Sequence, residues 1–598
     1  MGINEVSVGM FESLSDYKAL VFDYSVMFEV GGTPIFDELL DVIMKSGLDV
    51  YVSKTFKMLH YCVLRQADPK SKRAVDSMKT FCSYLLPDKK LHLVNELETG
   101  AFLEAFASVE GACILTTRNG IFTKRLYEKH PDFSGHVAIL TGRELKIFES
   151  VDKLTEDYPL PEVSKLALNN SYLDEYAFAS VGDVVKSKDQ RESYELIKRL
   201  SGGAEGMVFT TDNKNLVAKI YHRGTITPLR WAKLQKLADL GIRSNGFCLP
   251  RTLLYFNNIP VGYTMPLGQG TTLGSVFDGP DAILEQFPDW TRLDVVETLV
   301  SLIEKYLYLH LHNVVAGDIQ LKNALIASPK KVFLIDMDSV QAGNLPCPVG
   351  TEEFTDPRLW GKDFAGFVRG LCDEDYSIAM LVFSILFCGL HPYATRKGAE
   401  TLKEEIIEKN FPYTLDNSDE EHIPVGGYNH IWRRLPERLR TMLYQTFKCG
   451  TRYEAVQWYD AVSAYRDDII AMKLDDAEAY KLFPDSDYNQ KEYTGLADDF
   501  KPEEHKAADT ASAPAPAPSP FAQQAPAESK PAFAPVADGS AFQNSEPKPV
   551  FEKKTFAAPS GIYVPRNIGD PEAAKNSGAH KDEPEQNKKK GGKFFGLL

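Results

Sequence analysis

Short apolar runs alternate with helix-like segments over the first 150 residues of the chain. The apolar runs lie at 19–23, 49–52, 112–116 and 136–140. Continuous runs of this length are typical of strands buried in a parallel sheet. Ile35 to Ser46 instead has apolar residues at helical spacing and stops at Gly47, which is typical of a helix end. The alternation predicts a three-layer α/β domain, built on a parallel sheet, over residues 1–150.

The pattern changes in the middle of the chain. Residues 151–190 turn polar and predict a linker, whereas 191–470 open with strand-like sequence and become helical after about Trp290. Residues 471–505 predict a helical flank. The longest apolar stretch, Ile378 to Leu390, is 13 residues. At about 1.5 Å per residue it reaches ~20 Å, short of a ~30 Å bilayer core, so it predicts a buried helix and no transmembrane segment.

The last part of the chain, 506–598, is rich in proline and alanine and predicts a disordered tail. It ends in Lys588 to Leu598, which combines lysines with phenylalanines and leucines. A docking motif read by a partner, a weak anchor to anionic lipid and a plain solvated end all fit this composition. The tail also carries hydroxyls that are candidates for self-phosphorylation, at Thr510, Ser512, Ser519, Ser529 and Ser540.

Composition narrows the class of protein. A chain of 598 residues is expected to hold several domains, because single cores rarely exceed about 250–300 residues. Its formal charge of −16 and pI near 5.4 argue against stable nucleic-acid binding. The eight cysteines contain no C-x-x-C pair, and Met1 to Lys18 lacks the pattern of a secretory signal. These features predict a cytoplasmic protein with reduced thiols.

A glycine-rich turn precedes a buried lysine in the central region. The turn carries Gly202, Gly203 and Gly206, followed by Val208. Glycine allows backbone N–H groups to approach phosphate oxygens. Lys219 then alternates with apolar neighbours in the next predicted strand and points inward, where an ammonium is costly unless it meets an anion. A nucleotide phosphate is the expected anion.

Two acids and an amide follow at spacings that phosphoryl transfer demands. Asn323 follows Asp318 by five positions, and Asp336 follows Asn323 by thirteen. Asp318 is the candidate catalytic base that accepts a proton from an attacking hydroxyl. Asn323 and Asp336 offer oxygen ligands for Mg²⁺. Together with Gly202, Gly203, Gly206, Val208 and Lys219, these two residues form the predicted nucleotide site.

With these motifs the central region resembles the protein-kinase fold over about 280 residues. Asp336-Met337-Asp338-Ser339, with Val349-Gly350-Thr351 downstream, is similar to a bacterial subgroup of Ser/Thr (Hanks-type) kinase-like proteins. The segment 349–357 looks like the end of an activation segment. Asp375 resembles the acid that anchors the catalytic loop from below, and Arg452 resembles the arginine late in the helical lobe. The resemblance implies a two-lobed α+β domain that binds ATP and Mg²⁺ and phosphorylates protein Ser or Thr in bacterial signalling or stress response.

Around the lysine the chain departs from the family's pattern. The helix expected at Pro228 to Leu240 carries no glutamate to orient Lys219, and its acid Asp239 stands near the helix end. The glycine of the metal-binding triplet is replaced by Asp338. Without a glutamate in that helix Lys219 would be less firmly oriented, and phosphoryl transfer would be slow or absent. The alternative is therefore a pseudokinase scaffold that binds nucleotide without transferring phosphate.

The catalytic loop and the activation segment depart as well. Ala316-Gly317 replaces the usual His-Arg, and Gln320 replaces a lysine, as in small-molecule phosphotransferases. Those enzymes, however, lack an activation segment of the kind seen at 349–357. Arg358 replaces the glutamate that normally pairs with the late arginine, which is Arg452 here. The two arginines would repel each other unless Glu352 or Glu353 takes the place of the missing glutamate.

The N-terminal domain looks like a degenerate PIN-type nuclease fold. Such nucleases hold Mg²⁺ with several acids at strand ends. Asp23 is in place, Glu98 or Glu104 is a candidate second ligand, and Asn119 stands where an acid is usual. A non-catalytic sensing or docking domain is therefore favoured, and an RNase with a regulatory kinase domain is the remaining alternative.

Overall fold

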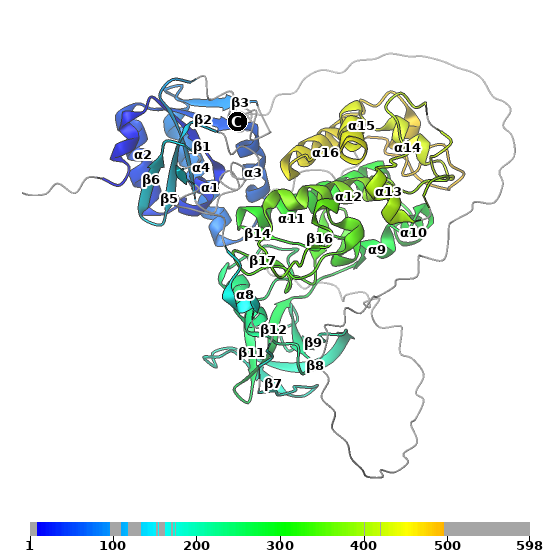
Figure 1. Ribbon diagram of the computed structural model, residues 1–598, viewed down its shortest axis with the longest axis horizontal. Helices are drawn as coiled ribbons and strands as arrows, with labels where there is room; N and C mark the ends of the chain where they lie inside the picture. The colour runs from blue at the N-terminus through cyan, green and yellow to red at the C-terminus, as the bar shows by residue number, and fades with distance from the viewer. Residues whose placement is uncertain are drawn as a thin grey trace, which may run out of the picture.

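The computed structural model describes residues 9–95, 109–117, 133–150, 153–154, 162–168, 171–173, 175–399, 401–418 and 420–495. It is a mixed α/β structure with an N-terminal parallel sheet, a β-barrel and a helical body (Figure 1). The predicted tail at 506–598, with its candidate hydroxyls and its Lys/Phe/Leu motif, lies outside the described residues.

The N-terminal domain has the predicted α/β construction. Its sheet has the order β3-β2-β1-β4-β5-β6, in which all neighbours are parallel except the last pair. The strands are β1 (Ala19–Phe22), β2 (Asp49–Ser53), β3 (Leu91–Val94), β4 (Ala112–Thr117), β5 (His136–Thr141) and β6 (Glu144–Phe148). The helices are α1 (Tyr24–Val30), α2 (Pro34–Ser46), α3 (Lys54–Leu64) and α4 (Pro69–Leu85). The four apolar runs therefore form β1, β2, β4 and β5, as predicted.

Local sequence sets the ends of these helices. Gly47 caps α2 in the left-handed conformation with φ of 64°, which glycine adopts without steric cost. Asp68 caps α4 by accepting a hydrogen bond from the Ser71 amide at 3.0 Å, and Pro69 supplies a favourable first residue.

A closed antiparallel barrel follows, in the order β10-β12-β11-β7-β8-β9. Its strands are β7 (Val184–Lys186), β8 (Ser193–Gly202), β9 (Gly206–Thr211), β10 (Leu216–Tyr221), β11 (Thr252–Phe256) and β12 (Ile259–Pro266). Helix α8 (Pro228–Asp239) connects β10 to β11. Strand β7 lies within the stretch 151–190, which the polar pattern predicts to be a linker. A three-residue strand has too short a pattern to predict its pairing with β8 and β11.

The helical body is built around three helices: α11 (Arg292–Leu311), α12 (Asp375–Leu386) and α16 (Ala455–Ile470). Smaller elements surround them: α9 (Leu273–Val276), α10 (Pro280–Gln286), α13 (Leu402–Glu408), α14 (Tyr428–Arg434), α15 (Glu437–Tyr444), β13 (Thr271–Thr272), β14 (Val314–Val315), β15 (Ala324–Ser328), β16 (Lys331–Leu334) and β17 (Gln341–Ala342). Every residue of α12 is buried, which confirms the predicted buried helix. Within the described residues, no helix combines the length and apolarity that crossing a membrane requires.

The N-terminal domain contacts the helical body through α3 and α4 (Figure 1). Lys54 in α3 pairs with Asp460 in α16 at 2.9 Å, and Arg65 pairs with Glu304 in α11. The buried carboxylate of Asp68 accepts hydrogen bonds from Tyr308 of α11 and, at 2.8 Å, from Ser244. One continuous apolar core includes residues of both parts, so the two parts form a single packed unit.

The nuclease interpretation gains no support from the described residues. The carboxylate of Asp23 follows β1 and accepts hydrogen bonds from the hydroxyls of Ser25 (2.5 Å) and Thr116 (2.6 Å). Burial raises its pKa. Glu98, Glu104 and Asn119 lie outside the part of the chain that the structure describes. Asp23 is the one candidate ligand that the described residues include, and the PIN-like assignment stays a prediction.

Candidate functional site

Lys219 lies in β10 and points into the structure, as its alternation with apolar residues predicts. Its cross-strand partners are Val208 in β9 and Tyr263 in β12. Its side chain is only 11% exposed, so the ammonium must be matched by nearby charge.

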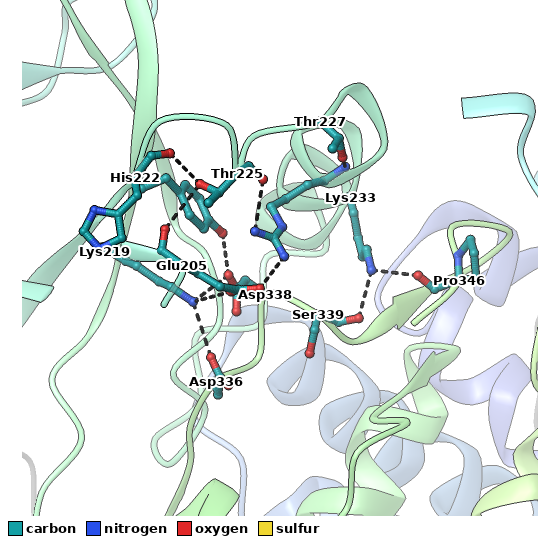
Figure 2. A network of polar contacts seen from close by, with 12 residues as sticks. Glu205, Lys219, His222, Thr225, Thr227, Lys233, Asp336, Asp338, Ser339 and Pro346 are labelled. Carbon is teal, nitrogen blue, oxygen red and sulfur yellow. Dashed lines mark hydrogen bonds and ion pairs between the residues drawn. The ribbon is translucent and has the colours of Figure 1, made fainter. Parts of the chain in front are cut away.

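Three carboxylates surround the Lys219 ammonium (Figure 2). The distances from its Nζ atom are 2.8 Å to Asp338, 3.3 Å to Asp336 and 3.5 Å to Glu205. Asp338 is the most buried of the three acids, with a side chain only 2% exposed. The expectation that Lys219 lacks a firm orienting acid is therefore wrong. The residue that replaces the family's glycine supplies the carboxylate that helix α8 lacks.

The charges of this cluster follow from burial and proximity. Burial opposes the charged form of Lys219, but the carboxylates of Asp338 and Asp336 outweigh it and raise the lysine pKa. Burial also opposes ionisation of Asp338, yet Lys219 and a hydrogen bond from Tyr221 lower its pKa. Partial desolvation inside the cluster and then the neighbouring Asp338 raise the pKa of Asp336, although its side chain is partly exposed and Lys219 acts in the opposite direction. Lys219 and Asp338 thus form the ionised pair at the centre.

Helix α8 is tied to the same segment through a lysine that sequence reasoning missed. The buried Lys233 donates hydrogen bonds to the carbonyls of Ser339 at 2.8 Å and Pro346 at 2.7 Å (Figure 2). Burial lowers the pKa of Lys233 to about 8. The helix therefore fixes the residues after Asp338 by donating to their backbone. A search for acids in α8 could not find this contact.

The glycine turn covers the lysine cluster from β8 and β9. The Gly203 amide donates to the Gly206 carbonyl at 2.9 Å, which closes the turn, and the space beside Gly203 is open. A side chain at Gly206 would meet the Ile220 carbonyl of β10 at 2.4 Å, so the close strand crossing requires glycine. Between them, Glu205 pairs with Arg230 of α8 at 2.6 Å. The turn thus carries an acid into the lysine site.

Asp318 and Asn323 lie together in the loop between β14 and β15. One Asp318 oxygen accepts hydrogen bonds from the Thr351 amide and hydroxyl, both at 2.8 Å. The other accepts from Gln320 at 2.9 Å and from Asn323 at 3.0 Å. Gln320 thus occupies a place beside the carboxylate, where the resemblance predicts a lysine. Four donors fix the direction of the Asp318 carboxylate.

A hairpin joins this loop to the lysine site. Asn323 directly precedes β15, Asp336 follows the end of β16, and the two strands pair with each other. The Ile335 amide donates to the Asn323 carbonyl at 2.9 Å. Asp336 adopts a φ of 55°, which is uncommon outside glycine and turns the chain sharply after β16. Lys219, Asp336, Asn323 and Asp318 are therefore linked through consecutive hydrogen bonds and chain neighbours.

The loop is anchored from below by Glu374, the residue next to the one predicted. Glu374 accepts hydrogen bonds from His310 at 2.8 Å and from the Gly317 amide at 2.7 Å. The resemblance assigned this role to Asp375. Glu374 thus contacts the loop directly at the position before Asp375, and the role that the resemblance assigns to Asp375 stays a prediction.

Arg369 also holds the loop and was not predicted. Its buried guanidinium donates to the Gly317 carbonyl and, at 2.5 Å, to the Val349 carbonyl. It thereby bonds the loop of Asp318 directly to the segment 349–357. This chain thus lacks the His-Arg motif, but Arg369, about fifty positions later, contacts the same loop.

The late arginine has a partner other than the predicted ones. Arg452 donates to the carboxylate of Asp356 at 2.6 and 3.1 Å, and Arg358 donates to the same group at 2.6 and 3.0 Å. Asp356 therefore separates the two arginines, whereas Glu352 pairs with Lys403 at 2.6 Å. Burial raises the pKa of Asp356, but the hydrogen bonds from Arg452 and Arg358 outweigh it and lower the value to about 2.

Asp356→Asn is expected to lower the free energy of unfolding by about 2.5 kcal/mol at pH 7, since each pKa unit corresponds to about 1.4 kcal/mol. The folded-state pKa lies below the ordinary value of 3.8. The stabilisation is therefore full above about pH 4 and is lost as the pH falls toward about 2. Urea unfolding between pH 3 and 7 measures it, with Glu352→Gln as an exposed control expected to change little. A difference between wild type and Asp356→Asn that does not shrink on acidification would contradict this role.

The described residues contain no cluster of three or more His, Cys, Asp or Glu side chains arranged to hold a metal ion. Mg²⁺ in phosphoryl-transfer sites needs no such cage, because it is bound through one or two carboxylates together with substrate phosphates and water.

Comparison with known proteins adds a second line of observation. The chain is 28% identical over 237 residues to "Protein kinase YegI" of Escherichia coli O157:H7, covering 37% of this chain and 36% of that protein. It is 28% identical over 290 residues to "Protein kinase YegI" of Escherichia coli strain K12, covering 45% and 44%. The match thus spans less than half the length of these curated relatives. No family model matches the chain.

The geometry and the relatives agree at a general level. The residues expected for phosphoryl transfer lie together, and the similar proteins carry the name of protein kinases. The chain is therefore similar to bacterial kinase-like proteins.

Proposed function

We propose that this protein is an ATP- and Mg²⁺-dependent Ser/Thr protein kinase with a two-lobed catalytic domain. The observation that carries the proposal is the convergence of Lys219, Asp318, Asn323 and Asp336 on one connected site. Lys219 would bind the α- and β-phosphates, and the glycine turn at Gly202, Gly203 and Gly206, with Val208, would cover the nucleotide. Asp318 would act as the base.

The donor set around Asp336 fits Mg²⁺. The Asp336 side chain is 60% exposed, and its Oδ2 atom accepts no hydrogen bond from a described residue. The side-chain oxygen of Asn323 likewise accepts no hydrogen bond from a described residue, while its side-chain nitrogen donates to Asp318. Asn323 and Asp336 would hold the ion, which would neutralise charge on the phosphates when bound. Three carboxylates around Lys219 already make the site acidic, so a bare triphosphate would be repelled.

The chemical step follows from the position of Asp318. The acceptor hydroxyl takes the place of one donor on the carboxylate, either the Gln320 amide or the Thr351 hydroxyl. Its oxygen attacks the γ-phosphorus and its proton passes to Asp318. The bond from the γ-phosphorus to the β–γ bridging oxygen breaks, and ADP leaves with the electron pair.

The ordered segment after Pro346 favours a protein acceptor over a small molecule. Arg369 binds its start, Thr351 contacts the base, and Asp356 is fixed by two arginines. This arrangement forms a surface beside Asp318 on which a polypeptide can lie. None of its contacts requires a phosphorylated residue, so we expect activity without prior phosphorylation of the segment.

Incubation with γ-labelled ATP and Mg²⁺ tests the proposal. We expect label to appear in protein as phosphoserine or phosphothreonine. Nucleotide binding without any transfer of label would support the pseudokinase scaffold and overturn the kinase proposal.

Asp338→Asn is expected to lower kcat/KM for ATP because Lys219 loses its shortest ion pair. Groups in contact couple by about 0.5–3 kcal/mol, which corresponds to roughly 2- to 150-fold. If Asp338 acts by positioning Lys219, the loss disappears in a Lys219→Met background. Tyr221→Phe, which removes only a donor to Asp338, is expected to cost less. Full additivity of Asp338→Asn and Lys219→Met in this double-mutant cycle would contradict the positioning role.

A further inference from the structure

A cavity of about 520 Å³ lies in the barrel away from the lysine site. It is bounded by the loop after β7, the end of α8 and the start of β11, with Arg243 and Arg251 among its lining residues. Its volume falls within the range of small-molecule sites, about 300–1,000 Å³. It therefore has room for more than a single bare ion.

Two of the three arginines that line this cavity, Arg243 and Arg251, have no ion-pair partner among the described residues. Neither guanidinium makes an ion pair or donates a hydrogen bond to any described residue, and the Nε atom of Arg251 is buried. Burial and then the nearby charge of Arg243 lower the pKa of Arg251. A guanidinium that is partly desolvated beside a second one is unfavourable unless an anion joins them.

Three acids also line the cavity, and each accepts a hydrogen bond from another lining residue and none from Arg243 or Arg251. Asp189 accepts from Ser187 at 2.6 Å, Glu192 accepts from Thr252 at 2.6 Å, and Asp239 accepts from Gln235 at 2.8 Å. The end of α8 carries partial negative charge that favours nearby cations, but neither guanidinium donates to its final carbonyls, two of which accept from Leu240 and Gly241. The lining holds four basic side chains, which are Lys188, Arg191, Arg243 and Arg251, against three acids, so it has a formal excess of one positive charge. The two guanidiniums without an ion pair are therefore the groups left to bind an anionic ligand.

We propose that Arg243 and Arg251 form a binding site for a phosphate monoester, either a phosphorylated side chain or a small phosphate ester. Guanidinium groups match phosphate oxygens in a bidentate fashion. Two of them suit a group that carries close to two negative charges. Leu253 and Tyr255 of β11, which also line the cavity, offer an apolar wall to the organic part of the ester.

Calorimetric titration of the full chain with two probes tests this site. The probes are a capped phosphoserine peptide and glycerol 1-phosphate, with the unphosphorylated peptide and glycerol as controls. We expect wild type to bind at least one phosphorylated probe, and the better one identifies the source of the phosphate. Arg251→Gln is expected to weaken that binding about 10- to 100-fold, the effect of losing a charge-assisted hydrogen bond.

Two further variants keep the test decisive. Arg243→Gln alters an exposed side chain, so its loss of binding cannot be ascribed to misfolding. Arg223→Gln removes an equal charge outside the cavity and is expected to bind like wild type. Failure of wild type to bind either phosphorylated probe would overturn the proposal, as would equal binding by wild type, Arg243→Gln and Arg251→Gln. The readout is independent of phosphoryl transfer, so the kinase proposal can fail without affecting it.

Discussion

Replacing Asp318 with asparagine is expected to lower the rate of phosphoryl transfer by about 10²–10⁴, the usual contribution of a general base. Asparagine cannot accept the proton of the attacking hydroxyl. Nucleotide affinity is expected to remain, because Lys219 and Asp336 are untouched. Single-turnover transfer from γ-labelled ATP measures the rate, and nucleotide titration measures the affinity.

The surroundings of Asp318 require a second variant in this experiment. An asparagine amide placed against the donors Gln320 and Asn323 forces one of them to turn, which would disturb Asn323 as well. Asp318→Ala removes the base without adding a donor and should show a loss of similar size. Glu353→Gln, a matched charge change on an exposed acid of the same region, serves as control. Retention of the wild-type rate in both Asp318 variants would contradict the assignment of the base.

Much of the architecture was predictable because burial leaves a strong signal in the sequence. The apolar runs that form β1, β4 and β5 are buried on both faces over most of their length, so each run is continuous in the sequence. In β2 one face is only partly buried, but the run remains recognisable. The spacing of Asp318, Asn323 and Asp336 was equally informative, since a short hairpin must bring its two ends together. The antiparallel pairing of β6 and the short β7 depend on partners elsewhere in the sheet and barrel, and no local pattern encodes them.

The partners of the charged residues were harder to predict. The resemblance places a carboxylate partner for Lys219 in α8, whereas the structure supplies it from Asp338, beyond β16. The partner of Arg452 is Asp356, a few residues after the predicted Glu352 and Glu353. Glu374, which contacts the loop before Asp318, is the neighbour of the predicted Asp375. Which of several neighbouring acids faces a given cation depends on backbone direction, which changes at each residue of a turn or helix start.

The contact between the N-terminal domain and the helical body had no sequence signal at all. Asp68 reads as a helix cap, and it is one. Its second role, accepting from Tyr308 and Ser244, joins residues more than 170 positions apart. The sequence around Asp68 is the same whether it only caps a helix or also accepts hydrogen bonds from another domain. Only the folded structure shows that it has both roles.

Asp336→Ala is expected to reduce phosphoryl transfer by roughly 10³-fold or more, because metal-ion stabilisation of the transferring group is worth several kcal/mol. The partly exposed Asp336 side chain makes one of three ion pairs to Lys219, so the variant should fold. Asp487→Ala, at an exposed carboxylate outside the site, is the matched control.

The most direct measurement is therefore transfer of label from γ-labelled ATP with Mg²⁺ by wild type, Asp336→Ala and Asp487→Ala, side by side. A kinase centred on Lys219, Asp318, Asn323 and Asp336 transfers label in wild type and Asp487→Ala and almost none in Asp336→Ala. Equal label in all three proteins, or none in any, would contradict it.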